Sequence, residues 1–152
     1  MKNHKIKSGR NFVITVASLA LMFYFSSCES GDKCNAGTGG DVTLILKPQH
    51  HGAAISNQPG YADSAFIKFL SYPVENYMAN EFPGDQASDY DMVATGTTGT
   101  AEVVVSGLRC GKYYIYMTGF DTSIVERVKG GIPIEVTERN GTVVKTIPVT
   151  ED

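Results

Sequence analysis

The feature that most constrains the fold of this chain is an alternation of apolar and polar side chains that begins at Asp41. In residues 41–47, every second position is apolar, at Val42, Leu44 and Leu46. A period of two places successive side chains on opposite faces of a strand, so the pattern predicts strands with one buried face. The same pattern recurs along the chain, and we predict strands at residues 41–47, 64–70, 90–95, 100–105, 112–118, 131–138 and 142–149.

Turn and proline signals separate these segments. Asn140-Gly141 supplies the positive φ angles of a tight hairpin turn, and a glycine-flanked turn at residues 96–99 precedes another segment. Pro133 and Pro148 cannot donate a ladder hydrogen bond, so we expect their strands to lie partly at a sheet edge. Seven short strands in about 110 residues predict an all-β, two-sheet sandwich.

The first 27 residues have the composition of a secretory signal. Residues 1–10 are basic, residues 12–25 are apolar or small, and Ser26-Ser27 precedes Cys28. The apolar run is shorter than the roughly 18–20 residues that a spanning helix needs. The segment resembles the lipobox of bacterial lipoproteins, although Phe25 stands where that family usually has Leu. We therefore expect residues 1–27 to be a lipoprotein signal peptide and Cys28 to carry a lipid. The alternative is an ordinary signal peptide with Cys28 in a disulfide.

Cleavage before Cys28 would leave an acidic protein of 125 residues. The signal contains four of the 13 basic residues and none of the 16 acidic ones, so nine basic residues face 16 acidic residues and the net charge is −7. Such a charge gives no electrostatic reason to bind nucleic acid. The glycine-rich residues 28–40 predict a flexible tether, and residues 41–152 the folded domain. We expect the protein in the bacterial cell envelope, anchored to the outer membrane and facing the periplasm or the cell surface.

Two further cysteines remain if Cys28 is acylated. Cys34 and Cys110 form an even pair in an oxidising compartment, where disulfides form and persist. A bridge between them would close a long loop, and the lost chain entropy of the unfolded state would stabilise the fold by on the order of 4 kcal/mol. We expect this disulfide, and two free thiols are the alternative.

Residues 99–120, with the sequence GTAEVVVSGLRCGKYYIYMTGF, resemble the signature of transthyretin-like (prealbumin-like) domains, which include carboxypeptidase regulatory-like modules. In that family a G-L-x-x-G-x-Y corner joins two alternating strands, and here it consists of Gly107, Leu108, Gly111 and Tyr113. The resemblance implies a seven-stranded, antiparallel Greek-key β-sandwich of the transthyretin-like or immunoglobulin-like kind. It also implies that Leu108 and Tyr113 are core residues and that the tyrosine hydroxyl bonds back to the corner backbone. Such modules are accessory, adhesive or binding domains, so the resemblance implies no fixed chemistry.

Two candidate metal ligands, His50 and His51, follow the first predicted strand. Imidazole together with carboxylate suits zinc or a similar ion. Adjacent residues on an extended chain point to opposite sides, however, and no H-x-H or C-x-x-C spacing supports a site. Two solvated loop histidines are the alternative. The carboxylates that could complete a metal site are those of Glu81, Asp85, Asp89 and Asp91.

Two tyrosines offer a candidate binding face. Tyr114 and Tyr116 have the opposite parity to Tyr113 and Ile115, so we expect them on the outer face of their sheet. There they could stack on a sugar ring or anchor a partner protein. The alternative is that they cover the sheet beneath residues 71–88, the longest segment without a strand signal.

The chain carries no recognisable catalytic motif: it lacks G-x-S-x-G, H-E-x-x-H, the P-loop and the dinucleotide fingerprint. Our first hypothesis is a non-enzymatic lipoprotein without a cofactor, an accessory or binding module for an envelope protein or a glycan. The second hypothesis is a metal-binding lipoprotein that uses His50, His51 and nearby carboxylates.

Overall fold

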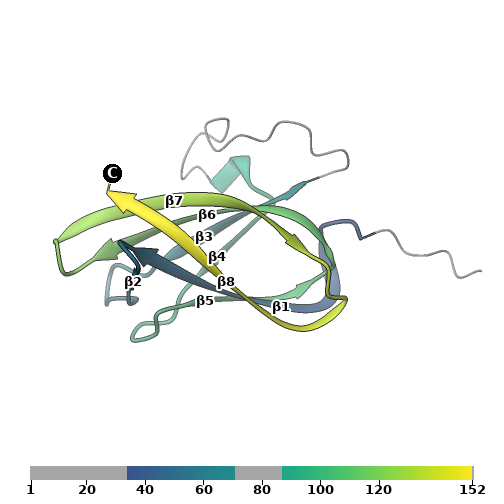
Figure 1. Cartoon of the computed structure of the whole chain (residues 1–152), viewed down its shortest axis with the longest axis horizontal. Coiled ribbons are helices and arrows are strands. Elements are labelled where there is room, and N and C mark those ends of the chain that lie inside the picture. The colour runs from purple at the N-terminus through teal and green to yellow at the C-terminus, as the bar shows by residue number, and fades with distance from the viewer. Residues whose placement is uncertain (1–33, 71–86, 152) are drawn as a thin grey trace, which may run out of the picture. The chain divides into compact units, whose positions relative to one another are not determined.

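The computed structural model of the chain describes residues 34–70 and 87–151 (Figure 1). All seven predicted strands are present in this part of the chain, together with one additional two-residue strand and a short 3₁₀ helix. The elements are β1 (Thr38–His50), β2 (Ala53–Ala54), β3 (Ser64–Leu70), η2 (Ala87–Asp89), β4 (Met92–Thr95), β5 (Val103–Leu108), β6 (Gly111–Asp121), β7 (Glu126–Val136) and β8 (Asn140–Glu151).

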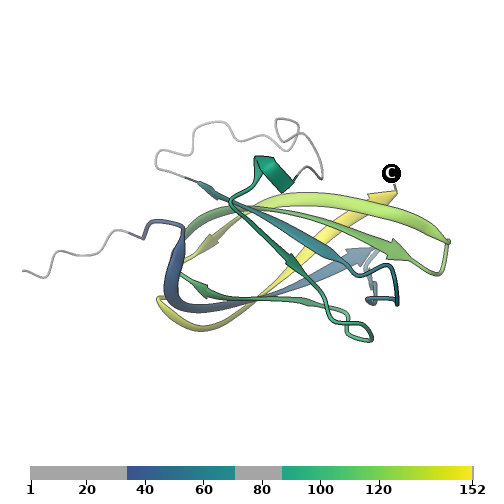
Figure 2. The ribbon, with the colours of Figure 1, turned by 180° about the vertical axis from the view of Figure 1, so that it is seen from behind.

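The strands form two layers that meet at β8, as the two opposite views show (Figures 1 and 2). One layer has the order β5–β1–β8, and β2 pairs with the end of β1 on the same side as β5. The other layer has the order β7–β6–β3–β4. The last residues of β8 join the layers by pairing with β7, at Val128↔Glu151 and Lys129↔Thr150. The all-β prediction is confirmed, and the two layers fit the β-sandwich class.

The prediction of seven antiparallel strands in a Greek key is wrong in its details. The described residues contain eight strands, and β1 and β8 run parallel from Asp41↔Asn140 to His50↔Val149. The sheet is therefore mixed. Side-chain alternation reports which face of a strand is buried, but it carries no information on the direction of the neighbouring strand.

The core lies between the two layers and includes the side chains predicted to face inward from β1, Val42, Leu44 and Leu46. Fully burying one large aliphatic side chain contributes roughly 1.5–3 kcal/mol, so this interior supplies most of the driving force for folding. The largest fully buried side chains include Leu44, Leu46, Ile67, Leu108, Tyr113, Ile115, Met117 and Ile147.

The two strand prolines lie outside the short ladder that pairs β7 with β8. Pro133 pairs with Tyr114 of β6, and Pro148 pairs with Gln49 of β1. The pairing between β7 and β8 is confined to the far end of the two strands. Pro133 and Pro148 therefore lack a ladder partner on the β7–β8 side, although both strands lie inside the sheet order and Gly130 of β7 packs against the Pro148 carbonyl.

The segment that precedes β1 is attached to the rest of the domain from Cys34 onward. Cys34 forms a disulfide with Cys110. Three residues later, the Gly37 carbonyl accepts a hydrogen bond of 2.9 Å from the Arg109 N–H. The segment predicted as a tether, residues 28–40, is therefore part of the fold from its seventh residue, and its first six residues lie outside the described part of the chain.

The corner between β5 and β6 has the predicted geometry. The buried Tyr113 hydroxyl donates a hydrogen bond of 2.5 Å to the Arg109 carbonyl and accepts one of 3.2 Å from the Gly37 N–H. Gly111 is needed because a Cβ atom there would overlap the backbone nitrogen of Ala36. The corner thus clamps the chain that enters β1 against the start of β6.

Candidate functional site

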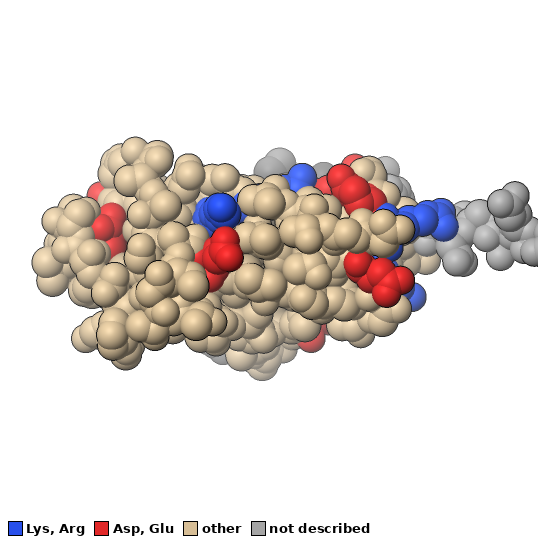
Figure 3. Space-filling view, turned by 90° about the horizontal axis from the view of Figure 1, so that it is seen from below, with Lys and Arg blue, Asp and Glu red and all other residues tan. Residues whose placement is uncertain are grey.

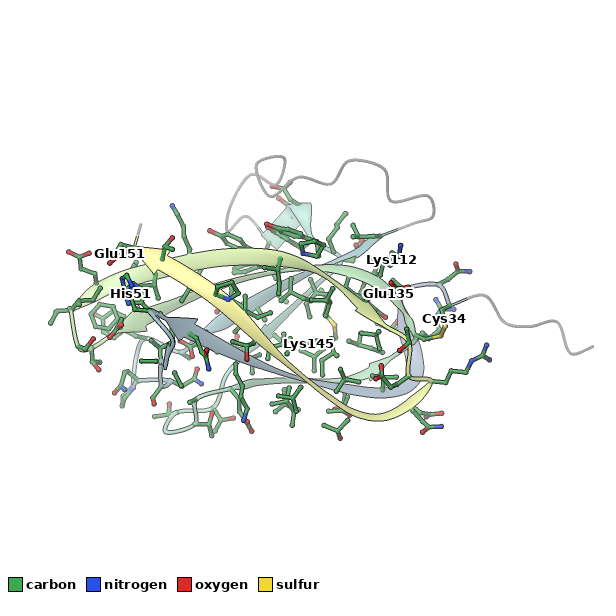
Figure 4. The ribbon with its side chains drawn as sticks, viewed as in Figure 1. Cys34, His51, Lys112, Glu135, Lys145 and Glu151 are labelled. Atoms are coloured by element: carbon green, nitrogen blue, oxygen red, sulfur yellow. A yellow bond between two sulfur atoms is a disulfide. The ribbon has the colours of Figure 1, made fainter. Side chains whose placement is uncertain are left out.

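At one end of the sandwich, the positions that face the interior carry polar side chains instead of apolar ones. The last residues of β1, β6 and β8 are His50, Asp121 and Glu151, and each lies on the inward-facing side of its strand. Asp63, directly before β3, lies on the inward-facing side of that strand. Figure 4 shows Glu151 and Cys34 at opposite ends of the domain. Buried polar groups cost free energy unless they are paired, so this end of the sandwich is the candidate site.

His50 and Asp121 form a buried pair. The His50 side chain is 3% exposed, and its Nδ1 lies 2.8 Å from Asp121 Oδ2. This hydrogen bond holds the pKa of His50 above its ordinary value of 6.5, although burial acts in the opposite direction. Ser123 donates to Asp121 Oδ1 from its hydroxyl at 2.7 Å and from its backbone N–H at 2.8 Å. These bonds and the one from His50 hold the pKa of Asp121 below its usual value.

The next residue, His51, turns back toward His50. Its φ is +48°, because it begins the tight turn between β1 and β2. The positive φ ends the extended conformation of β1, and the two imidazole centroids lie 4.2 Å apart. The expectation that adjacent histidines point to opposite sides is therefore wrong here, since it holds only where both residues belong to a strand.

Glu151 approaches both histidines from the end of β8. The parallel pairing of β1 with β8 places His50 opposite Val149, two residues before Glu151. Glu151 Oε1 lies 3.3 Å from the Nε2 atoms of both His50 and His51. The contact with His51 is a hydrogen bond. The contact with the buried His50 Nε2 is an ion-pair contact that does not have hydrogen-bond geometry. The backbone N–H of Glu151 and then the His51 ring hold the pKa of this carboxyl below its usual value.

Asp63 is a second buried carboxyl group on the inward face. Its backbone is fixed, because its N–H donates to Asn57 Oδ1 at 2.7 Å and its carbonyl accepts from the Gly96 N–H at 2.9 Å. Its side chain is fully buried, and neither carboxyl oxygen has a hydrogen-bond partner. The Asp63 carboxyl lies against Gly119, and the Ile55 side chain lies against the same glycine. Loss of hydration raises the pKa of Asp63 to about 6.

The carboxylates predicted to accompany the histidines lie elsewhere. Asp91 Oδ1 is 3.5 Å from Lys68 Nζ, and its Oδ2 accepts a hydrogen bond of 2.7 Å from the Phe69 N–H. This is the opposite end of β3 from Asp63, six residues or roughly 20 Å along the strand. Asp89 belongs to η2 beside it. The prediction that these two aspartates share a metal site with the histidines is wrong. Glu81 and Asp85 lie outside the described residues.

The two outward tyrosines are buried rather than open to a ligand. Tyr114 is 1% exposed and Tyr116 is 8% exposed. They pack in a second apolar cluster on the outer face of the β7–β6–β3–β4 layer, together with Phe66, Leu70 and Tyr90. The prediction that these tyrosines point to the outer face of their sheet is right. Their burial fits the alternative in which they cover the sheet better than it fits a site where a ligand stacks on them.

The outer face of the other layer carries few charged side chains (Figure 3). Val104, Ile45 and Val144 form a row across β5, β1 and β8, and the two valines are 51% and 54% exposed. Lys47 lies 3.9 Å from Glu102 on the same face. This face offers apolar area and a partly exposed ion pair rather than convergent donor groups, so we do not place the site there.

Sequence reasoning found the two histidines and missed their real partners. Asp121 and Glu151 occupy inward-facing positions of their strands, as His50 does. A count of polar residues at inward positions would have found all three, because such residues conflict with the local pattern and mark strained or functional positions.

Comparisons with protein-family models, with curated proteins and with solved structures find no match to this chain. Across residues 34–70 and 87–151, no helix has the length and apolar character that crossing a membrane requires.

Proposed function

We propose that this chain is a lipid-anchored, non-enzymatic binding module of the bacterial cell envelope, attached to the outer membrane through Cys28. The basic and then apolar leader that ends at Cys28 supports the anchor. Six residue steps separate Cys28 from the disulfide-bonded Cys34, and they span roughly 20 Å at full extension. The Cys34 end of the domain would then stand close to the membrane.

The observation that carries the proposal is the position of the histidine–carboxylate cluster relative to Cys34. β1 leads from Thr38, beside the disulfide, to His50 through 13 residues, which correspond to about 40 Å of strand. The cluster of His50, His51 and Glu151 would therefore face away from the anchoring membrane. A site at that end can receive a ligand from the surrounding solution.

The contacts of the cluster support binding rather than catalysis. The Ser123 hydroxyl donates to Asp121 and not to His50. In the part of the chain that the structure describes, no serine or cysteine forms a nucleophile–base pair with this histidine. We assign the domain to the transthyretin-like modules as part of the same proposal, and the buried Tyr113 corner supports this assignment.

The anchor is tested by mass spectrometry and fractionation of the protein from its native host. The membrane-extracted protein should begin at Cys28 and carry a diacylglyceryl group, and Cys28→Ala should move the protein to the soluble fraction. Cys110→Ala is the matched control, because it removes a cysteine without touching the anchor and should stay in the membrane. A Cys28→Ala protein that remains membrane-bound would refute the anchor.

A further inference from the structure

Three potential ligand atoms converge at the end of the sandwich that is remote from Cys34. One ligand atom from each of His50, His51 and Glu151 lies within 4.8 Å of the other two. They come from the last residue of β1, the turn after it and the last residue of β8, so sheet pairing holds them in place. Figure 4 shows His51 and Glu151 side by side at this end.

We propose that these three residues bind a divalent transition-metal ion, with Zn²⁺ as the best match, and that Asp121 orients His50 for this role. The inference rests on the proposed function, because it names the ligand of the binding module. It does not require the lipid, because the three ligand atoms belong to the folded domain alone.

The donor set and its spacing match such an ion. Imidazole nitrogen and carboxylate oxygen are the ligands of zinc sites with two histidines and one acidic residue. Bonds of about 2.0–2.1 Å in a tetrahedron place neighbouring ligand atoms roughly 3.3 Å apart. Glu151 Oε1 lies 3.3 Å from each of the two imidazole Nε2 atoms, which matches this spacing. The largest separation in the set, up to 4.8 Å, exceeds the roughly 4.2 Å that two such bonds can span, so the exposed His51 ring has to rotate toward His50 when the ion binds. Three protein ligands leave the fourth position for water or another small ligand.

The second observation is the buried Nε2 atom of His50, which lies 3.3 Å from Glu151 Oε1 without a hydrogen bond that satisfies it. This is a costly arrangement for a polar atom in a protein interior. Because Nδ1 donates its hydrogen to Asp121, the neutral ring carries its lone pair on Nε2, the atom that faces Glu151 and His51. A metal ion at this point would satisfy the lone pair.

Asp121 has the contacts of a carboxylate that positions a metal-binding histidine. Metal-bound histidines usually donate their second N–H to a carboxylate or a carbonyl, which fixes the tautomer and the ring orientation. Asp121 accepts the His50 hydrogen at 2.8 Å, and two hydrogen bonds from Ser123 hold it in place. Asp121 is thus a positioning residue, and Ser123 in turn fixes Asp121.

The other ligands leave access from solvent. The side chain of His51 is 76% exposed and that of Glu151 is 46% exposed, while His50 forms the buried floor. The site is therefore open on one side, as an exchangeable ion or a metal-bridged ligand requires. Substitution of the two exposed residues does not disturb the core, which makes them the best test positions.

The experiment measures Zn²⁺ binding to the full chain in detergent, by competition with a chromophoric chelator. The wild-type protein should bind one Zn²⁺ per chain. His51→Ala and Glu151→Gln should each raise the dissociation constant by roughly tenfold or more, and Asp121→Asn by about 10–100-fold. Glu135→Gln is the matched control, because it makes the same change at the Cys34 end of the domain (Figure 4) and should leave the affinity unchanged.

A second readout separates ligation from general loss of charge. Co²⁺ in place of Zn²⁺ should give the visible absorption of a four-coordinate site in the wild-type protein, and the His51→Ala protein should lose it. Circular dichroism of each variant shows that the fold is retained. If His50→Ala fails to fold, the exposed variants alone decide the outcome.

Two results would overturn the metal site. The first is a wild-type chain that binds no Zn²⁺, which would leave His50 as an ion-pair partner of Asp121 and Glu151. The second is a wild-type affinity in the double variant of His51→Ala and Glu151→Gln, which would place the metal on other residues. Either failure is distinguishable from failure of the anchor, since membrane fractionation tests Cys28 separately.

Discussion

Replacement of Asp63 by Asn should change how the stability of this protein depends on pH. The Asp63 side chain is fully buried, and neither of its oxygens has a hydrogen-bond partner, so folding strips its charge of hydration without compensation. The pKa of this carboxyl is about 6 in the folded protein, against an ordinary value of 3.8. The folded state therefore favours the protonated group.

The sign and the pH range follow from linkage. Between pH 3.8 and about 6, the folded state binds more protons at Asp63 than the unfolded state does. The free energy of unfolding due to this group therefore falls as the pH rises through that range and is constant above it. One pKa unit corresponds to about 1.4 kcal/mol, so at pH 8 the ionised Asp63 destabilises the fold by on the order of 3 kcal/mol relative to its neutral form.

The assay is guanidinium unfolding of the oxidised full chain, followed by circular dichroism from pH 4 to pH 8. The amide that replaces the carboxyl in Asp63→Asn is also buried, and its burial cost is an offset that does not vary with pH. The free energy of unfolding of Asp63→Asn minus that of the wild type should therefore rise by on the order of 3 kcal/mol between pH 4 and pH 8. The contributions of His50, Asp121 and Glu151 are common to both proteins and cancel.

Asp41→Asn is the matched control, because it makes the same chemical change on a side chain that stays in water. A difference between Asp63→Asn and the wild type that stays flat from pH 4 to pH 8 would refute the reasoning. It would mean that the buried carboxyl keeps its charge stabilised by a partner that we have not identified.

Three further variants test the rest of the fold. The double variant of Cys34→Ala and Cys110→Ala opens a loop of 76 residues, so its free energy of unfolding should be lower by about 4 kcal/mol in guanidinium titrations, and an unchanged midpoint would speak against the bridge. Tyr113→Phe removes the hydroxyl that donates to the Arg109 carbonyl and should cost about 1–2 kcal/mol in thermal unfolding, with an unaltered melting temperature as the contrary result. Tyr114→Ala should cost about 3–5 kcal/mol as a buried aromatic truncation, whereas an exposed ligand-binding tyrosine would cost little.

The local pattern of this sequence was sufficient to find the strands. The predicted segment at residues 64–70 has the same bounds as β3, and the other predicted strands overlap β1, β4, β5, β6, β7 and β8. The reason is that alternation and turn residues act within a few positions of each other. The two-residue β2 escaped notice, because two residues are too few to show a period.

The candidate site was predictable only in part. His50 and His51 could be chosen because histidine is a common metal ligand. A search for polar residues at the inward-facing positions of strands would have added Asp121 and Glu151. Nothing local could bring them together, because Asp121 lies 71 residues from His50 in the sequence. Glu151 lies 100 residues from His51, and only strand pairing joins those two.

The sequence by itself determined which segments form strands and which side chains of those strands face inward. These properties depend on steric preferences and burial within a short stretch of chain. The tertiary structure decided that β8 runs parallel to β1, that the His51 turn folds its ring back and that Glu151 meets both histidines. These outcomes depend on how distant strands share one apolar interior, which no short segment encodes.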